Sequence, residues 1–256
     1  MVTLDALFSL RGLTAVVTGG SSGIGRAIAI ALGGAGASVV IVARDGERIA
    51  AVVREISDAG GRAAGVIGDL STRDGIRAAA DAAVEPFGDP DILVNSAGIN
   101  LRPPFDEIDM AVWDATMTVN LEAPFLLSQR FAPRMIERGF GRLIHISSQQ
   151  AHRAFVTSGV YGVSKGGLES LTRSQAEAWS AHGVTANTLV PGFVLTPLNA
   201  RLQTDAVKVQ QLAERTMVGR NGLPEDFAGI AVLLAGRSSG YITGQSLFVD
   251  GGLSVH

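Results

Sequence analysis

Short apolar, β-branched runs alternate with longer alanine-rich segments along the whole 256-residue chain, and this alternation most constrains its fold. The runs are apolar at nearly every position, which is typical of parallel strands buried on both faces. Seven are predicted as strands, over residues 14–18, 38–43, 63–68, 91–95, 142–147, 184–190 and 246–250. Helical stretches that often stop at glycine lie between the first six. The pattern predicts an α/β fold: a doubly wound, parallel, seven-stranded sheet in a single domain over residues 1–256.

One segment departs from this rhythm. From Thr196 to Gly222 the chain is polar and only weakly amphipathic, and it follows the sixth predicted strand. An ordinary pair of surface helices would give the same pattern. Open parallel sheets bind ligands in a crevice beyond the carboxyl ends of their strands, so a substrate lid around residues 193–222 is the functional interpretation.

Composition excludes several classes of protein. The chain has no cysteine, so disulfides, thiolate catalysis and cysteine-based zinc sites are excluded, and we expect no metal. A formal charge of −3 gives no electrostatic reason to expect nucleic acid as a partner. No apolar run approaches the ~18 residues that would span a bilayer. Asp5 comes early and no basic leader precedes an apolar run, so we do not expect a signal peptide. We expect a cytoplasmic protein.

The first predicted strand leads into the sequence TGGSSGIG, with glycines at Gly19, Gly23 and Gly25. Glycines permit a tight turn, let a pyrophosphate approach the backbone, and leave the amides of the following helix free to bind it. A glycine-rich turn without a ligand would look similar. The position between a strand and an amphipathic helix favours a Rossmann-type dinucleotide site, and the missing Gly-Lys-Ser/Thr excludes a Walker loop.

The second predicted strand ends in Ala43, Arg44 and Asp45. An acid at this place would bind the ribose hydroxyls of NAD, whereas an arginine accommodates the extra phosphate of NADP. Ala43 occupies the position where the acid normally stands, and Asp45 can cap the next helix. NADP(H) bound through Arg44 is therefore the preferred prediction, and NAD(H) bound through Asp45 stays open as the alternative.

Only two tyrosines occur in the chain, and one of them, Tyr161, is followed four residues later by Lys165. This spacing places both on one face of a helix. A free phenol titrates near ~10, and a neighbouring ammonium favours the phenolate and lowers that pKa. A pair of this kind also occurs by chance on helices. Together with the glycine loop, it indicates acid–base chemistry beside a dinucleotide.

With these motifs the chain resembles the short-chain dehydrogenase/reductase family, in its short single-domain branch, over essentially its whole length. The resemblance rests on TGGSSGIG at 18–25, Asp69 in GDLS, NSAG at 95–98, Asn120 in VNLEAPF, Ser148, the Tyr161–Lys165 pair, and Pro191–Gly192 with Thr196. The tyrosine–lysine spacing differs from that of enoyl reductases. The glycine spacing and the chain length differ from those of the extended epimerases.

The resemblance implies the roles of the site residues. Ser148 would hold a substrate carbonyl, Tyr161 would deliver the proton, and Lys165 would bind the nicotinamide ribose and lower the tyrosine pKa. Asn120 would hold a water that links the lysine to solvent. The cofactor would contact Gly19, Ser21, Ser22, Gly23, Ile24, Gly25, Arg44, Asp69, Leu70, Asn95, Ala97, Gly98, Tyr161, Lys165, Pro191, Gly192, Val194 and Thr196. A homotetramer is also implied, with the helices of Asn120 and Tyr161 and the FVDGG region as contacts.

Candidate substrate residues follow the catalytic motifs, and most are polar. They are Asn100, Arg102, Gln149, Gln150, His152, Arg153 and Phe193. The arginines favour a small anionic substrate, whereas Phe155 and Phe193 would suit an apolar one. The whole pattern resembles gluconate 5-dehydrogenase-like and 3-oxoacyl-carrier-protein reductase-like members, with a slight preference for a sugar acid or polyol. A non-catalytic dinucleotide sensor or scaffold is the alternative of another class, and such proteins usually lose the tyrosine or the lysine.

Overall fold

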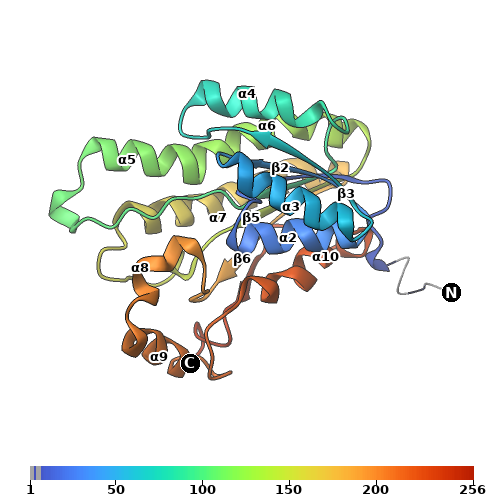
Figure 1. Cartoon of the computed structure of the whole chain (residues 1–256). Helices are drawn as coiled ribbons and strands as arrows, with labels where there is room; N and C mark the ends of the chain where they lie inside the picture. The colour runs from blue at the N-terminus through green and yellow to red at the C-terminus, as the bar shows by residue number, and fades with distance from the viewer. Residues whose placement is uncertain (1–2, 4–6) are drawn as a thin grey trace.

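The computed structural model describes residue 3 and residues 7–256, which form a parallel sheet of seven strands (Figure 1). The strands are β1 (Thr14–Thr18), β2 (Ser38–Ala43), β3 (Arg62–Ile67), β4 (Ile92–Asn95), β5 (Gly141–Ile146), β6 (Val184–Pro191) and β7 (Ser246–Val249). Their order in the sheet is β3-β2-β1-β4-β5-β6-β7. Every predicted strand is confirmed to within one residue at each end, and so is the doubly wound, single-domain α/β fold. Asp5, which carried the interpretation of the N-terminus, lies outside the described residues.

Helices connect the strands. The α-helices are α2 (Gly23–Gly34), α3 (Gly46–Asp58), α4 (Arg73–Val84), α5 (Met110–Met117), α6 (Ala123–Glu137), α7 (Gly159–Trp179), α8 (Ala200–Gln203), α9 (Ala206–Glu214) and α10 (Ala228–Ala235). Single 3-10 turns are η1 (Phe105–Glu107), η3 (Gln149–Ala151), η4 (Ser180–His182), η5 (Pro197–Asn199), η6 (Pro224–Phe227) and η7 (Arg237–Ser239), and η2 (Thr118–Glu122) is a π-helical turn. In the described part of the chain, no helix is both long enough and apolar enough to cross a membrane.

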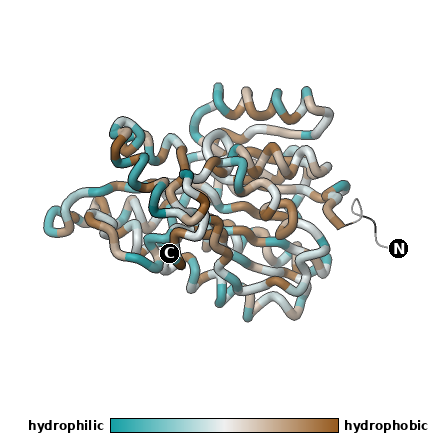
Figure 2. The backbone as a smooth tube through the Cα atoms, turned by 90° about the horizontal axis from the view of Figure 1, so that it is seen from below, coloured by the Kyte–Doolittle hydropathy of each residue, from teal (hydrophilic) through white to brown (hydrophobic). Residues whose placement is uncertain are grey.

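The sheet is buried between two helical layers, as its apolar strands require. Alternate residues of β1 face opposite layers: Val17 packs in the cluster that includes α2, α3 and α10, and Val16 in the cluster of α4, α6 and α7. Ile28 of α2 and Phe131 of α6 are fully buried. Burial of such a side chain contributes roughly 1.5–3 kcal/mol. The outer helices are amphipathic, so their hydropathy alternates along the backbone (Figure 2).

The strands were predicted to be buried on both faces, but the two edge strands, β3 and β7, have exposed side chains. Ile67 at the end of β3 is 73% exposed, and Phe248 in β7 is 41% exposed. Both strands have a neighbour on one side only, because β3 and β7 end the sheet. Apolar composition alone does not reveal the order of the strands, so it could not separate edge strands from central ones.

The order of the strands determines where a ligand can enter. β1 pairs with β2 on one side and with β4 on the other, so the chain leaves β1 and β4 in opposite directions across the sheet. A crevice forms at the carboxyl ends of strands that diverge in this way. Gly19 after β1 and Ala97 after β4 meet at this point.

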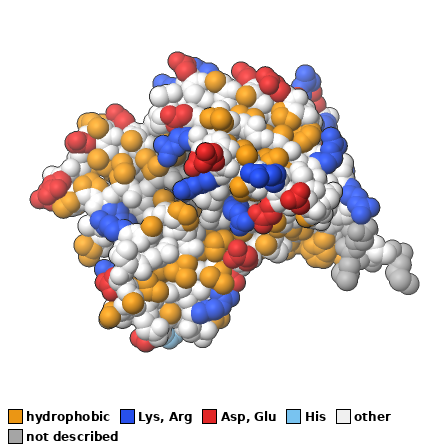
Figure 3. All heavy atoms as spheres, viewed as in Figure 1, with side chains coloured by type: hydrophobic (Ala, Val, Ile, Leu, Met, Phe, Trp, Pro, Cys, Tyr) orange, Lys and Arg blue, Asp and Glu red, His pale blue; other side chains and the backbone are white. Residues whose placement is uncertain are grey.

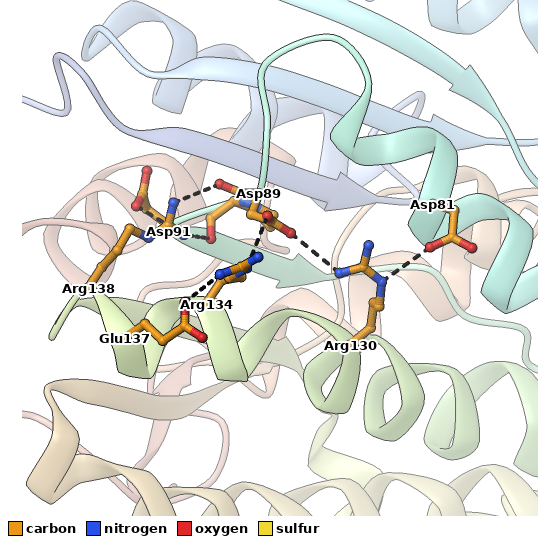
Figure 4. Close-up of polar contacts among 8 residues, drawn as sticks. Asp81, Asp89, Asp91, Arg130, Arg134, Glu137 and Arg138 are labelled. Carbon is orange, nitrogen blue, oxygen red and sulfur yellow. Dashed lines mark hydrogen bonds and ion pairs between the residues drawn. The ribbon is translucent and has the colours of Figure 1, made fainter.

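The loop that leads from α4 into β4 is held by arginines on α6 and directly after its end (Figure 4). Arg130 lies 3.2 Å from the carboxylate of Asp81 and 3.4 Å from that of Asp89. Arg138 donates to the carbonyl oxygens of Asp89 (3.1 Å) and Pro90 (2.7 Å). Exposed pairs of this kind each contribute about 1 kcal/mol or less. Arg130 and Arg138 both contact Asp89 of the loop, and Arg130 also contacts Asp81 of α4. These contacts join α4, the loop and α6, and so they position the start of β4.

Candidate active site

A cavity of about 770 Å³ lies at the carboxyl ends of β1, β4, β5 and β6. The predicted catalytic and cofactor residues that line it are Gly19, Ser22, Gly23, Ile24, Ala97, Gly98, Ser148, Tyr161, Lys165, Pro191, Gly192, Val194 and Thr196. The predicted substrate residues that line it are Asn100, Arg102, Gln149, Gln150 and Phe193. Segments far apart in the sequence are thus brought to one chamber, as the topology requires.

The glycine loop forms one wall of the cavity and has no room for side chains. Gly19 has φ +66°, and a Cβ there would lie 2.8 Å from the Cα of Ala97. A Cβ on Gly25 would lie 2.5 Å from the carbonyl oxygen of Gly19. The helix that follows, α2, has no side-chain cap from Ser22, whereas Asp45 caps α3. Its first amide groups are therefore left for an anionic group in the cavity.

The tyrosine and the lysine both lie on α7 and are buried. Burial raises the pKa of Tyr161, while a hydrogen bond with Ser148 and the positive charge of Arg102 act to lower it. The Nζ of Lys165 donates to the carbonyl oxygen of Ile146 (2.7 Å) and lies 5.7 Å from the centroid of the tyrosine ring. Burial lowers the pKa of Lys165 to about 8.

A second cation, which the sequence analysis did not assign to this role, acts on the tyrosine. The charge of Arg102 lowers the pKa of Tyr161, and the predicted effect of Lys165 on the same phenol stays a prediction. The lysine ammonium is bound to the main chain at the end of β5. The spacing of four residues predicted a shared helix face correctly, but it could not predict which carbonyl the long side chain would reach.

Asn120 is fully buried in the π-helical turn η2 between α5 and α6. Its Oδ1 accepts from the amide of Ile99 (2.9 Å), and its Nδ2 donates to the carbonyl of Ile99 (2.9 Å) and to Ser164 Oγ (3.1 Å). π-helical turns inside α-helices occur often at functional sites. Here the turn aims the amide at Ile99, directly after the NSAG sequence, and both amide hydrogens are used. The predicted role of Asn120 in holding a water stays a prediction.

Arg44 and Asp45 lie beyond the end of β2, outside the cavity lining. Asp45 accepts from the amide of Arg48 (3.1 Å) and its carboxylate lies 3.1 Å from the Nε of the same residue. It therefore caps α3, as the preferred interpretation of this acid held. Arg44 is exposed and forms no ion pair with any residue that the structure describes.

Three other predicted cofactor residues make contacts away from the cavity. Asp69 is exposed and accepts from the amide (3.0 Å) and the hydroxyl (2.8 Å) of Ser71. Leu70 is buried in the core beneath α4. The Nδ2 of Asn95 lies 3.1 Å from Nδ1 of His145, within the sheet. Burial lowers the pKa of that histidine to about 4, so it is neutral and accepts the hydrogen bond.

Two predicted substrate residues are also directed elsewhere. His152 contacts the buried carboxylate of Glu169, 2.9 Å away, one turn beyond Lys165 on α7. Arg153 donates to the carbonyl of Ser254 (2.9 Å). Neither lines the cavity. Their positions next to Ser148 in sequence made them candidates, but buried or distant partners determine where they lie.

The C-terminal segment supports the residues that follow Ser148, and the sequence analysis did not find this. Asp250 accepts from Gln149 Nε2 (2.9 Å) and from the amides of Gly252 (3.0 Å) and Ser254 (2.8 Å). Leu253, within this loop, lines the cavity. The Asp-Gly-Gly sequence, typical of a turn, was the signal that could have indicated an organised loop here.

The predicted lid corresponds to a segment that leaves the sheet and returns to it. At its base, Val194 and Gly222 form an isolated bridge, with Gly222 donating to Phe193 (2.9 Å) and accepting from Leu195 (3.1 Å). Between these points the segment forms η5, α8 and α9, which extend below the sheet in Figure 1. The amide of Val218 donates to the carbonyl of Gly251, so the lid also contacts the C-terminal loop.

The cavity is strongly positive for a chain of net charge −3. Its lining includes Arg102, Lys165, Arg201, Lys208 and Arg215. Among the described residues that line it, none is aspartate or glutamate. No group of three or more acids and histidines that could hold a metal ion occurs in the described chain. The cavity therefore combines a buried phenol, a serine hydroxyl and a field that attracts anions.

Comparison with known proteins places this site in a family. A family model described as enoyl-(acyl carrier protein) reductase matches residues 19–254. A gluconate 5-dehydrogenase of Gluconobacter oxydans is 37% identical over 249 residues, 97% of each chain. The chain belongs to the short-chain dehydrogenase/reductase family. It is an oxidoreductase.

Solved structures of the family have the same fold. A gluconate 5-dehydrogenase from Burkholderia cenocepacia, in complex with NADP and tartrate, has a TM-score of 0.93 at 38% identity, covering 99% of this chain and 100% of that one. A 3-oxoacyl (acyl-carrier-protein) reductase from Agrobacterium tumefaciens, with NADP bound, has a TM-score of 0.91 at 34% identity, covering 97% of each chain. The relatives are named for carbonyl or alcohol chemistry, in line with the spacing of Tyr161 and Lys165.

In this dehydrogenase, Arg102→Gln is expected to move the pH profile of alcohol oxidation to higher pH. Oxidation needs the phenolate of Tyr161 as a base, and the charge of Arg102 lowers the pKa of that phenol. Without this charge the effect of burial is less opposed, so the pKa rises further. The profile of kcat/KM from neutral to alkaline pH measures the shift. Arg102→Lys keeps the charge and should keep the profile, and an unchanged profile in Arg102→Gln would contradict the assignment.

Proposed function

We propose that the protein is an NADP(H)-dependent dehydrogenase that interconverts a carbonyl and a secondary alcohol on a small, anionic polyhydroxy substrate such as a sugar acid. The observation that supports this best is the charge of the cavity, which has five cationic side chains and no carboxylate among the described residues that line it. A carboxylate substrate gains charge-assisted hydrogen bonds there. A neutral apolar substrate would leave the guanidinium groups desolvated without partners.

The residues present fit a nicotinamide dinucleotide. The glycine wall packs directly against the backbone of Ala97, where a Cβ at Gly19 would collide, and α2 begins next to this wall with an uncapped N-terminus. Arg44 is exposed without an ion pair in the described chain, whereas Asp45 is engaged by α3. This supports NADP(H) over NAD(H), and the solved relatives that hold NADP agree with it. A nicotinamide dinucleotide bound there would supply or accept the hydride.

The chain's own residues would position the substrate and move the proton. The hydroxyl of Ser148 binds the substrate oxygen next to Tyr161, with which it already shares a hydrogen bond. In reduction the phenol donates its proton to that oxygen, and burial favours the protonated form that this needs. Lys165, buried beside the ring, binds the nicotinamide ribose, and Asn120 holds the NSAG loop in place.

The segment 193–222 would act as the lid of this site. It contributes Arg201, Lys208 and Arg215 to the cavity and is joined to the sheet at the bridge between Val194 and Gly222. A segment attached at its base can move over a bound substrate and exclude water from the reacting atoms.

A second candidate is reduction of a 3-oxoacyl group on a carrier protein. It is favoured by apolar side chains that the lid adds to the cavity, namely Leu198, Leu202 and Leu212. The Agrobacterium relative named for this activity has the same fold. These leucines lie on the lid, where an acyl chain would leave the cavity. The cations include Arg102, whose charge acts on the phenol of Tyr161. The charge near the reacting atoms therefore favours the sugar acid.

A substrate panel tests the proposal. Initial rates would be measured with 5-keto-D-gluconate, D-gluconate, an acetoacetyl thioester and a steroid ketone, each with NADP(H) and with NAD(H). We expect the highest kcat/KM for the sugar acids with NADP(H). Turnover of the thioester alone would favour the second candidate. No turnover on any of the four would support a non-catalytic dinucleotide sensor, which the retained Tyr161 and Lys165 argue against.

We also propose a homotetramer, because apolar side chains gather on two separate faces. Met110 and Trp113 of α5 and Phe125 of α6 are 66%, 38% and 41% exposed, and the α5 side shows many hydrophobic side chains in Figure 3. Phe248 and Tyr241 are exposed near the edge strand β7. Contiguous apolar surface of this kind marks protein interfaces, and two separate self-complementary faces would close a tetramer. Light scattering at micromolar concentration is expected to give four times the mass of one chain. A monomeric mass would contradict the proposal.

A further inference from the structure

Two arginines from different segments of the chain line the same cavity. Arg102 lies in the loop after β4, close enough to Tyr161 for its charge to act on the phenol. Arg201 lies on α8 of the lid. The charge of Arg201 lowers the pKa of Arg102, in addition to the larger effect of burial, so the two guanidinium groups interact. The phenol, Arg102 and Arg201 therefore line one cavity, and the last of the three lies on the lid.

Neither of these arginines has an acidic partner among the described residues, although many others do. Arg26 is paired with Glu55 and Arg73 with Glu122 on the surface. Arg102 donates to Asn100 Oδ1 (3.2 Å), a neutral group, which orients the guanidinium without neutralising it. Two like charges that face one chamber repel each other unless an anion lies between them.

We infer that Arg201 is a specificity-determining residue: when the lid closes, its guanidinium binds the substrate carboxylate from the side opposite Arg102. The inference rests on the proposed function, because it names the part of the substrate that the lid recognises. Arg201 is assigned this role rather than Lys208 or Arg215, because it lies in the stretch 197–202 of the lid, of which all residues but one line the cavity, and because its charge also acts on Arg102.

The attachment of α8 is suited to this movement. Asn199 Nδ2 donates to the carbonyl of Val194 (3.0 Å), and Gln203 Nε2 donates to the carbonyl of Thr196 (2.7 Å). Asn199 is the last residue of η5 and Gln203 the last residue of α8, so the two bonds tie η5 and α8 to the start of their own segment. The two elements can therefore move together about the base of the lid. Arg201 itself is exposed and needs no bond to the rest of the protein to be broken before it moves.

The charges of Arg102 and Arg201 make closure of the lid depend on whether the substrate is an anion. A carboxylate placed between the two guanidinium groups replaces their repulsion with attraction on both sides, so it stabilises the closed lid. A neutral polyol of the same length leaves the repulsion in place. Arg201 should therefore affect the binding of acids, while the binding of the dinucleotide along the glycine loop is left unchanged.

The test measures binding of D-gluconate to the protein loaded with NADPH, a pair that cannot react, by calorimetry, in wild type, Arg201→Gln, Arg201→Lys and Arg77→Gln. Arg77 is an exposed arginine of α4, outside the cavity, so its replacement controls for a change in net charge. We expect Arg201→Gln to raise the Kd for gluconate by about tenfold or more, as the loss of a charge-assisted pair requires. Arg201→Lys should raise it less, because the charge remains and the planar fork is lost. The Kd of NADPH should stay within about twofold in all variants.

Other outcomes separate this inference from the proposed function. A gluconate Kd that is unchanged in Arg201→Gln overturns the inference, and turnover of sugar acids by the same variant at wild-type KM would leave the proposed function intact. A wild-type protein that binds no gluconate also overturns it. Binding of gluconate that depends on Arg201, without redox turnover of any sugar acid, would support the anion site and refute the proposed reaction.

Discussion

Replacing Tyr161 by phenylalanine is expected to lower kcat by roughly 10²- to 10⁴-fold, the usual contribution of a general acid. The phenol is buried at the start of α7 and shares a hydrogen bond with Ser148, so its oxygen lies where a substrate carbonyl would be held. Phenylalanine keeps the ring and its packing but cannot donate a proton. Single-turnover kinetics with NADPH and 5-keto-D-gluconate would measure the loss at the chemical step.

The chain contains its own control for this change. Tyr241, the other tyrosine, is fully exposed at 102%, and Tyr241→Phe should leave the rate unchanged. Thermal unfolding and NADPH binding of the Tyr161 variant should match those of wild type, which separates a chemical defect from a folding defect. Near-normal turnover in Tyr161→Phe would rule out the phenol as the proton donor.

Arg44→Ala is expected to weaken NADPH binding by about 100-fold while NADH binding changes little. The 2′-phosphate can form charge-assisted hydrogen bonds with this guanidinium, and two such bonds contribute enough for a loss of that size. Asp45 cannot take over the ribose without giving up its cap on α3 and its contact with Arg48. Fluorescence titration of both cofactors gives the two Kd values.

Arg54, an exposed arginine farther along α3, is the matched control, since Arg54→Ala removes the same charge away from the end of β2. An equal loss of NADPH and NADH affinity in Arg44→Ala would indicate a disturbed fold rather than a lost phosphate contact. A wild-type preference for NADH would assign the ribose to Asp45.

The parts of the fold that could be predicted are those encoded locally. Strand runs such as Thr14–Thr18 are apolar throughout because the sheet is covered on both faces, and the Tyr161–Lys165 spacing is a property of one helix. The order of the strands is a tertiary property. For that reason the exposed ends of β3 and β7 could not be distinguished from the central strands.

The orientation of loop side chains could not be predicted from the sequence either, because it also depends on tertiary contacts. His152 and Arg153 follow Ser148 as closely as Gln150 does, yet Gln150 lines the cavity and the other two do not. The histidine is held by Glu169, 17 residues later, and the arginine by Ser254, 101 residues later. The sequence analysis also did not predict that Arg201 of the lid lines the cavity. The segment around it has no regular hydrophobic period from which its position relative to the sheet could be predicted.

The order in which the chain is synthesised matters for this site. Gly19 and the wall it forms leave the ribosome long before Asp250, which holds Gln149, and Gly251, which accepts from Val218 of the lid. A nascent chain without β7 and its following loop would already contain the tyrosine and the lysine but would lack this support. Translation products that stop before Asp250 would therefore be inactive even though they contain all the residues assigned to the chemistry.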